Sequence, residues 1–403
     1  MHQTRLSPFR SILAGICAIG VALGMSRFAY TPLVPALIRD GWVDVPQAGF
    51  LGGANCTGYV VSCLIAIFVP RRCGIQSVMR MGLVFALLGV LMSSFNFGFS
   101  WLVVARFIAG LSAAPLVVLT PSVLASQLPE KLKKIGAGLA FSGAGLFTLF
   151  VSLTLPFVLT KDVQIGWFYE ALLIALASLA VWPLTSRASE QPLPAPPQSA
   201  RFTGNQNKVL MGLGVAYACG AIGMQPPTLF MTDYLHRDLG VAIAEASQIF
   251  SFLGLGFAVG AGSSGLLVTQ FGSRATLLTM FSSGIASLIL VLITKQTVLM
   301  AVAAGLSGFF VLGMVSATSQ RTMECVGPEQ HPRVWGNLSL IFAFGLSVGS
   351  LGMSAFLKRG ATYTNLFEIA TVALGVGLVV TAVLSCKQLV SDASSAKTIK
   401  GIH

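Results

Sequence analysis

Two arginines lie deep inside long apolar stretches of this chain. Arg27 lies about sixteen residues into the first stretch, and Arg106 lies within the fourth. In a bilayer such a residue costs at least about 2.5–3.5 kcal/mol at the centre of a helix, so it normally faces a cavity or a polar partner. A guanidinium binds carboxylates and phosphates through paired hydrogen bonds. The arginines therefore indicate either a cationic site for an anionic solute or structural residues that bond to helix carbonyls or a buried partner.

Other polar residues in the apolar stretches could complete such a site. Gln225 directly precedes two prolines, Pro226 and Pro227. A proline has no N–H, so this segment leaves backbone carbonyls without helical donors. These carbonyls could bond a solute, or the segment could be a kink that neighbouring side chains fill. Pro32 should bend the first stretch, as a tolerated kink or as part of a gate. The other candidate contacts for a solute are Tyr30, Asn55 and Asn337.

Two acids could carry protons. Glu170 and Glu368 are 198 residues apart, and each lies six or seven residues from the end of an apolar stretch. Their positions leave two interpretations open. They either take up protons that drive transport, or they satisfy helix ends and pair with nearby basic residues.

Enzymatic chemistry finds no support in the sequence. The nucleotide-binding pattern Gly-x-x-x-x-Gly-Lys-Ser/Thr does not occur, and the four histidines are scattered without clustered ligands. The seven cysteines show no metal-site spacing, so we expect them to be free, small packing residues. We therefore expect no enzyme activity, no cofactor and no metal.

The composition requires a lipid environment for the elements that position these residues. Of 403 residues, 55% are hydrophobic and 9% are charged, whereas a soluble domain is about 25% charged. A bilayer core about 30 Å thick needs roughly 20 apolar residues per helix. The sequence contains twelve such runs, at 11–38, 46–70, 75–96, 99–126, 135–159, 163–185, 208–235, 242–270, 274–294, 297–320, 333–357 and 362–386.

The orientation follows from the distribution of Lys and Arg. One side of the predicted membrane protein carries 17 of them and the other side 6, and cytoplasmic loops are the basic ones. We therefore expect a multi-pass inner-membrane protein with both termini in the cytoplasm. The net charge of +12 then reflects topology and not a nucleic-acid surface.

The chain divides into two similar halves. Residues 186–207 are rich in Pro, Ser and Gln and predict a cytoplasmic linker between a bundle at 1–185 and a bundle with a short tail at 208–403. Residues 48–74 align without gaps on 246–272, which matches Gly58 with Gly256 and Gly74 with Gly272. An even number of helices separates the copies, so they have the same direction across the membrane. This predicts a parallel repeat of six helices.

These features resemble the major facilitator superfamily over essentially the whole chain. The segment from Gly24 to Leu33 (GMSRFAYTPL) is similar to the signature of its YbfB/YjiJ-like branch. The resemblance implies the all-α major facilitator fold with twelve transmembrane helices. It also places Arg27 beside a central cavity, because helices 1, 4, 7 and 10 border the cavity in this superfamily.

Local motifs of the superfamily are matched in part. Arg106 with Gly110 resembles motif B, whose arginine is associated with proton coupling. Arg72 and Gly74 occupy the place of motif A, a gating loop, but its acidic residue is missing, and retention of positive charge in the cytoplasm explains Arg72 equally well. The glycine-rich segment 136–145 lacks the Gly-Pro pair of the antiporter motif C, which counts against a typical drug/proton antiporter.

The sequence therefore predicts a secondary transporter that moves a small, anionic solute by alternating access, coupled to protons as in much of the superfamily. The alternative within transport is an exporter of drugs or metabolites, and a non-transporting membrane sensor is a third hypothesis. The expected partners are the solute, membrane lipid and protons. We expect a monomer that does not bind nucleic acid.

Overall fold

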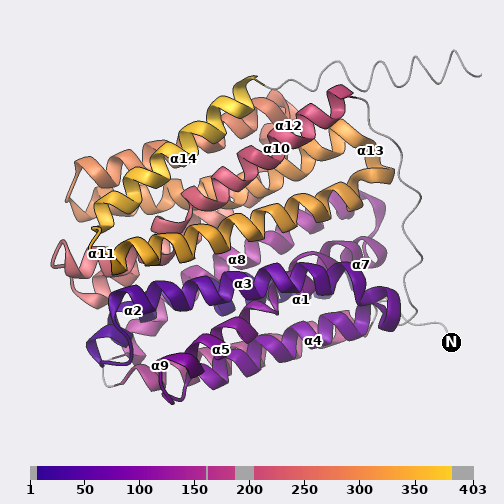
Figure 1. Cartoon of the computed structure of the whole chain (residues 1–403). Helices are drawn as coiled ribbons and strands as arrows, with labels where there is room; N and C mark the ends of the chain where they lie inside the picture. The colour runs from indigo at the N-terminus through magenta and orange to yellow at the C-terminus, as the bar shows by residue number, and fades with distance from the viewer. Residues whose placement is uncertain (1–6, 160–161, 187–203, 384–403) are drawn as a thin grey trace, which may run out of the picture.

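The computed structural model describes residues 7–159, 162–186 and 204–383, and these residues form helices without a strand (Figure 1). The elements up to residue 185 are α1 (Pro8–Ile19), the π-helix η1 (Gly20–Phe28), α2 (Tyr30–Arg39), α3 (Val45–Phe68), α4 (Pro70–Ser93), α5 (Phe99–Gly110), α6 (Ala113–Val117), α7 (Leu119–Gln127), α8 (Glu130–Val158) and α9 (Val163–Thr185). The elements from residue 204 onward are α10 (Gly204–Gly223), the π-helix η2 (Pro226–Phe230), α11 (Met231–Arg237), α12 (Ile243–Ile293), α13 (Thr297–Lys358) and α14 (Tyr363–Val383). Most of the predicted linker and both chain termini lie outside the described residues.

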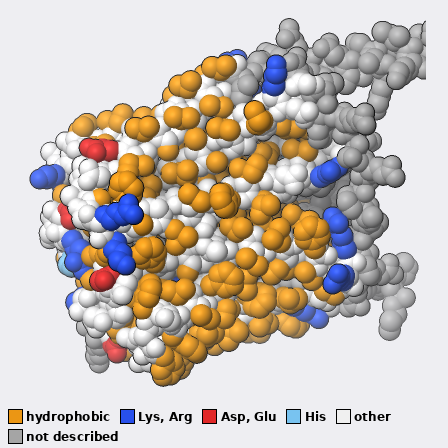
Figure 2. Space-filling view, viewed as in Figure 1, with side chains coloured by type: hydrophobic (Ala, Val, Ile, Leu, Met, Phe, Trp, Pro, Cys, Tyr) orange, Lys and Arg blue, Asp and Glu red, His pale blue; other side chains and the backbone are white. Residues whose placement is uncertain are grey.

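Eleven helical segments among the described residues are long and apolar enough to cross a membrane. Figure 2 shows the corresponding surface, a broad apolar band with Lys and Arg side chains near its two ends. The prediction of an all-α membrane protein is confirmed at this level. The predicted count of twelve spans differs from the eleven segments because α12, with 51 residues, covers the two predicted runs 242–270 and 274–294.

Glycines interrupt the long helices where the sequence predicted short loops. Gly74 inside α4 has φ 76°, and Gly272 inside α12 has φ 82°. Side chains with a Cβ avoid this left-handed region, so glycine is required to turn the chain there. The break predicted between the second and third runs, at residues 71–74, thus includes the non-helical residue Gly74, which lies inside α4.

Helices from early and late parts of the chain pack closely against each other. α3 lies against α13, and α8 lies against α12. A Cβ at Gly145 of α8 would lie 2.5 Å from the carbonyl oxygen of Gly254 in α12. The glycine-rich segment 136–145 thus includes a residue that allows two helices to approach closely, as expected for membrane helices.

One expectation about cysteines is wrong. The free thiols described by the structure are Cys17, Cys56, Cys63, Cys73 and Cys219, whereas Cys325 is disulfide-bonded. A disulfide depends on which segments the fold brings together, and residue spacing does not show this.

Candidate functional site

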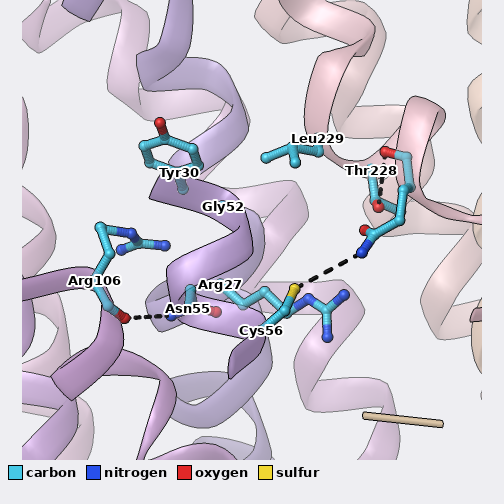
Figure 3. A pocket seen from close by; sticks show the side chains of 9 residues that line it. Arg27, Tyr30, Gly52, Asn55, Cys56, Arg106, Thr228 and Leu229 are labelled. Carbon is cyan, nitrogen blue, oxygen red and sulfur yellow. Dashed lines mark hydrogen bonds between the residues drawn. The ribbon is translucent and has the colours of Figure 1, made fainter. Parts of the chain in front are cut away.

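A small cavity lies between the π-helices η1 and η2 and the helices α2, α3 and α5 (Figure 3). Its volume is about 20 Å³, which is room for about one water molecule and far below the roughly 300–1,000 Å³ found for small-molecule sites. Its lining residues are Arg27, Tyr30, Gly52, Asn55, Cys56, Arg106, Gln225, Thr228 and Leu229. The structure therefore brings five predicted substrate contacts, which lie far apart in the sequence, to one place.

The backbone beside the cavity departs from the α-helix on both sides. η1 spans residues 20–28, and η2 spans residues 226–230 and begins with the two prolines that follow Gln225. π-helical turns are rare and occur frequently at functional sites. Both halves of the chain thus present irregular helix to the same cavity.

Threonines close the gap between α2 and the η2–α11 segment. Pro35 has no N–H, so the carbonyl of Thr31 lacks its usual helical donor, and the hydroxyl of Thr232 donates to that carbonyl at 2.6 Å. The hydroxyl of Thr31 in turn donates to the carbonyl of Thr228. These bonds join the two halves of the chain directly beside the cavity.

Asn55 connects three elements at the cavity wall. Its side-chain amide donates to the carbonyl of Ser26 in η1 at 3.2 Å and to the carbonyl of Arg106 in α5 at 3.3 Å. α5 can approach this closely because residue 110 is glycine: a Cβ at Gly110 would lie 2.0 Å from the backbone oxygen of Asn55. The predicted cavity residue Asn55 therefore positions Arg106 as well as lining the cavity.

Arg27 is half-buried and faces the cavity. Its guanidinium carbon lies 5.2 Å from the centre of the Phe28 ring, and no carboxylate among the described residues lies within 4.0 Å of it. Figure 3 shows Arg27 and Arg106 on opposite sides of Asn55. The cavity is thus bordered by two cationic side chains, and its lining contains no acid.

Arg106 contacts two aromatic rings and a backbone carbonyl and is only 1% exposed. Its guanidinium carbon lies 4.6 Å from the centre of the Tyr30 ring and 5.6 Å from that of Trp167, and these two rings stack at 6.1 Å. One terminal nitrogen, Nη2, donates to the carbonyl of Ser26 at 3.1 Å. The other two nitrogens, Nε and Nη1, have no hydrogen-bond partner among the described residues.

Gln225 fixes the opposite side of the cavity. Its side-chain amide donates to the carbonyl of Leu346 in α13 and also approaches the sulfur of Cys56 at 3.8 Å. Gln225 is 1% exposed. The bond to Leu346 satisfies the amide nitrogen of Gln225 between apolar helices, and it holds the side chain at the cavity wall.

Glu170 lies behind the cavity on α9. It is fully buried, and neither carboxylate oxygen has a hydrogen-bond partner among the described residues. Glu170 interacts electrostatically with Arg106, but no nitrogen of Arg106 comes within 4.0 Å of its oxygens. Glu170 therefore forms no close ion pair among the described residues, and both interpretations of its role stay predictions. Its depth along the helix did not reveal which neighbours face it.

The remaining predicted residues do not lie in this cavity. Asn337 and Glu368 are exposed, and Asn365 donates to Glu368 at 3.4 Å. Arg72 is exposed near the start of α4, and Gly74 breaks that helix. Pro32 is buried in the first turn of α2, directly after η1.

Sequence reasoning missed several residues of the site. Trp167 was not singled out, although its spacing of three residues from Glu170 places both on one helix face. Thr31 and Thr232 were also missed, because a hydroxyl in an apolar helix usually bonds within its own helix and gives no signal of a partner. The position of Pro35, four residues after Thr31, was the available clue.

The described region is similar to proteins that are named as membrane transporters. The family model described as "Uncharacterised MFS-type transporter YbfB" matches residues 19–384. Two relatives from Bacillus subtilis (strain 168) are named uncharacterized MFS-type transporters. YbcL is 20% identical over 393 residues, which cover 96% of this chain and 97% of YbcL. YceJ is 24% identical over 366 residues, which cover 85% of this chain and 87% of YceJ.

Proposed function

Because this chain belongs to the YbfB family of MFS-type (major facilitator superfamily) transporters, we propose that it moves a small anionic solute across the membrane by alternating access, coupled to protons. The observation that carries the charge preference is the cavity lining, which contains Arg27 and Arg106 and no acid. Two guanidinium groups can bind a carboxylate or phosphate strongly where water is scarce. A lipophilic cation would be repelled by the same lining.

The proposed architecture is two bundles of six spans, at 1–185 and 208–403. α12 would extend about 76 Å at 1.5 Å per residue, far more than one crossing of a bilayer about 30 Å thick. Dividing it at Gly272 gives twelve spans. The similar φ angles at Gly74 (76°) and Gly272 (82°), which are 198 residues apart, support the parallel repeat. The excess of Lys and Arg on one side supports cytoplasmic termini in an inner membrane.

Alternating access is supported by the hydroxyl contacts between the two halves of the chain. The hydroxyls of Thr31 and Thr232 bond to carbonyls of the opposite half of the chain. Further bonds of this kind join Thr57 to Ser347 at 2.7 Å and Ser247 to the carbonyl of Ser152 at 2.7 Å. Such hydroxyl contacts can part without leaving a buried charge. This makes the junction suitable for opening when the two bundles rock.

The proposal is tested by ligand-dependent thermal stability of the purified protein. A ligand that binds the native state stabilises it by RT ln(1 + [L]/Kd), about 2.7 kcal/mol at one hundred times Kd. The probes are benzoate, succinate, sulfate, tetraphenylphosphonium and glucose. Wild type, Arg27→Ala and the control Arg359→Ala, an exposed arginine at the end of α13, are compared.

The proposal predicts that anions stabilise the wild type and Arg359→Ala, whereas Arg27→Ala folds and loses the shift. Stabilisation of all three proteins by tetraphenylphosphonium, with no response to anions, contradicts the anion preference and favours the export of lipophilic compounds. Arg27→Lys distinguishes charge from geometry, because lysine keeps the charge but cannot form the paired hydrogen bonds.

A further inference from the structure

A second group of unsatisfied polar atoms lies behind the cavity. It comprises Nε and Nη1 of Arg106, Nε1 of Trp167 and both carboxylate oxygens of Glu170. All three side chains are at most 1% exposed. Buried polar atoms are nearly always hydrogen-bonded, because an unsatisfied one costs about 1–3 kcal/mol and a charged one more. A cluster of them in one place points to a group that binds there during the working cycle.

The surroundings of Glu170 leave it one electrostatic partner. α1, η1, α2, α4 and α8 pack against α9. Titratable groups on these elements include Cys17 on α1, Arg27 on η1, Tyr30 on α2 and Arg80 on α4; no titratable side chain of α8 is among those described. Tyr30 donates its hydroxyl to the carbonyl of Ala48, and Arg80 bonds to hydroxyls near the far end of α9. The charge that acts on Glu170 is that of Arg106, from α5.

Arg106 stands between two possible anions. It lines the solute cavity, and it also interacts with Glu170 behind the cavity. Two of its three nitrogens are free to form hydrogen bonds. An ionised Glu170 attracts the guanidinium away from the cavity, whereas a protonated Glu170 leaves the guanidinium charge for a solute.

We propose that Glu170 is the proton-binding residue of this transporter and that its protonation favours binding of the anion at Arg106. The proton passes from water to the carboxylate, and the neutral carboxyl group can then donate to a neighbouring acceptor. The proton and the anion therefore bind together and leave together, which makes the transporter a symporter. This inference rests on the proposed function, because it requires an anion in the cavity.

Glu170 lies closer to the start of its helix than to the end. It lies seven residues after Val163, the first residue of α9, which corresponds to about 10 Å along the axis. Its counterpart at the offset of 198, Glu368, is exposed and bonded to Asn365. The repeat thus supplies a carboxylate in both halves, but burial distinguishes the one that can control an arginine.

The first test needs no solute. Infrared spectroscopy follows the carboxylic C=O band from about pH 6 to about pH 9, where acids of ordinary pKa stay ionised. We expect a band that disappears as the pH rises in the wild type and in Glu368→Gln and that is missing from Glu170→Gln. A wild-type spectrum without any titrating band that depends on Glu170 overturns the proposal.

The second test measures the affinity for sulfate, benzoate and succinate over the same pH range by calorimetry. As the pH rises, the affinity should fall by about 5- to 150-fold, which is the range that typical coupling free energies produce. Binding of the anion should also be accompanied by uptake of a proton. Glu170→Gln should bind tightly at every pH without proton uptake, and Glu368→Gln should behave like the wild type.

The outcomes separate this inference from the proposed function. Anion binding that keeps its pH dependence in Glu170→Gln, or that has none in the wild type, contradicts the role of Glu170 and leaves the anion cavity intact. A titrating Glu170 in a protein that binds tetraphenylphosphonium and no anion contradicts both the anion preference and the symport. Arg106→Lys, which keeps the charge, should retain the titration and weaken anion binding.

Discussion

Replacing Gly110 with alanine tests how the cavity wall is held together. A Cβ at this position would lie 2.0 Å from the backbone oxygen of Asn55, whereas ordinary contact begins at 3.4 Å. α3 and α5 would therefore have to separate locally by about 1.4 Å. That displacement breaks the bond from the Asn55 amide to the carbonyl of Arg106 in α5, which is already 3.3 Å long.

The expected cost follows from these contacts. Overpacking costs about 1–3 kcal/mol, a buried amide that loses an acceptor costs about 1–3 kcal/mol, and alanine regains about 1 kcal/mol of helix propensity. We therefore expect Gly110→Ala to lose about 2–4 kcal/mol of stability. It should also weaken anion binding, because Asn55 and Arg106 both line the cavity.

Gly305→Ala is the control, because Gly305 is also a glycine inside an apolar helix, α13, but has no close neighbour. A Cβ at Gly305 has only one neighbour within 4 Å, the carbonyl oxygen of Phe252 at 3.8 Å. Thermal unfolding in detergent and anion calorimetry should separate the two variants, with Gly305→Ala at or above the wild type. Equal unfolding temperatures and equal affinities would refute the argument from close contact at Gly110.

Three further perturbations test other parts of the structure. Gly74→Ala and Gly272→Ala should each lower stability by about 1–2 kcal/mol through backbone strain alone, because no atom lies within 4 Å of either new Cβ; unchanged unfolding temperatures would contradict the left-handed breaks. Partial burial raises the pKa of Asp40, but hydrogen bonds from its neighbouring arginine and from the N–H that begins α9 hold that pKa below its usual value. The stabilising effect of Asp40 is therefore present above about pH 4 and is lost as the pH falls through the lowered pKa. Asp40→Asn should thus be destabilised by up to about 1 kcal/mol at neutral pH, and a difference from wild type that persists in acid would argue against this linkage. The double variant Thr31→Cys/Thr228→Cys should form a disulfide under oxidation and stop transport until it is reduced, whereas cross-linked protein with full transport activity would show that this junction does not open.

The sequence predicted the cavity better than its surroundings. Arg27, Arg106, Asn55 and Gln225 could be identified because a polar side chain in an apolar helix needs a reason to be there, and the resemblance placed helix 1 beside a cavity. Depth along a helix did not predict burial. Glu170 and Glu368 have equivalent positions in the repeat, yet one is buried and the other exposed.

Helix rotation and packing decide such cases, and both depend on neighbours. α9 turns the face that carries Trp167 and Glu170 toward Arg106, and single-sequence periodicity in an almost wholly apolar helix does not specify that face. Asn337 is the converse case, a polar residue that the fold leaves exposed outside the cavity. The number of spans was likewise difficult to read, because α12 continues through Gly272 with a single non-helical residue.

Uptake into proteoliposomes measures whether the protein carries an anion together with protons. A radiolabelled anion that binds in the thermal-stability screen is placed outside vesicles whose interior is more alkaline than the medium. We expect uptake that the proton gradient drives, that collapses with a protonophore, and that is lost in Arg27→Ala but retained in Arg359→Ala. Uptake that is equal in Arg27→Ala and the wild type, or that occurs only with lipophilic cations, would contradict an anion transporter built around this cavity.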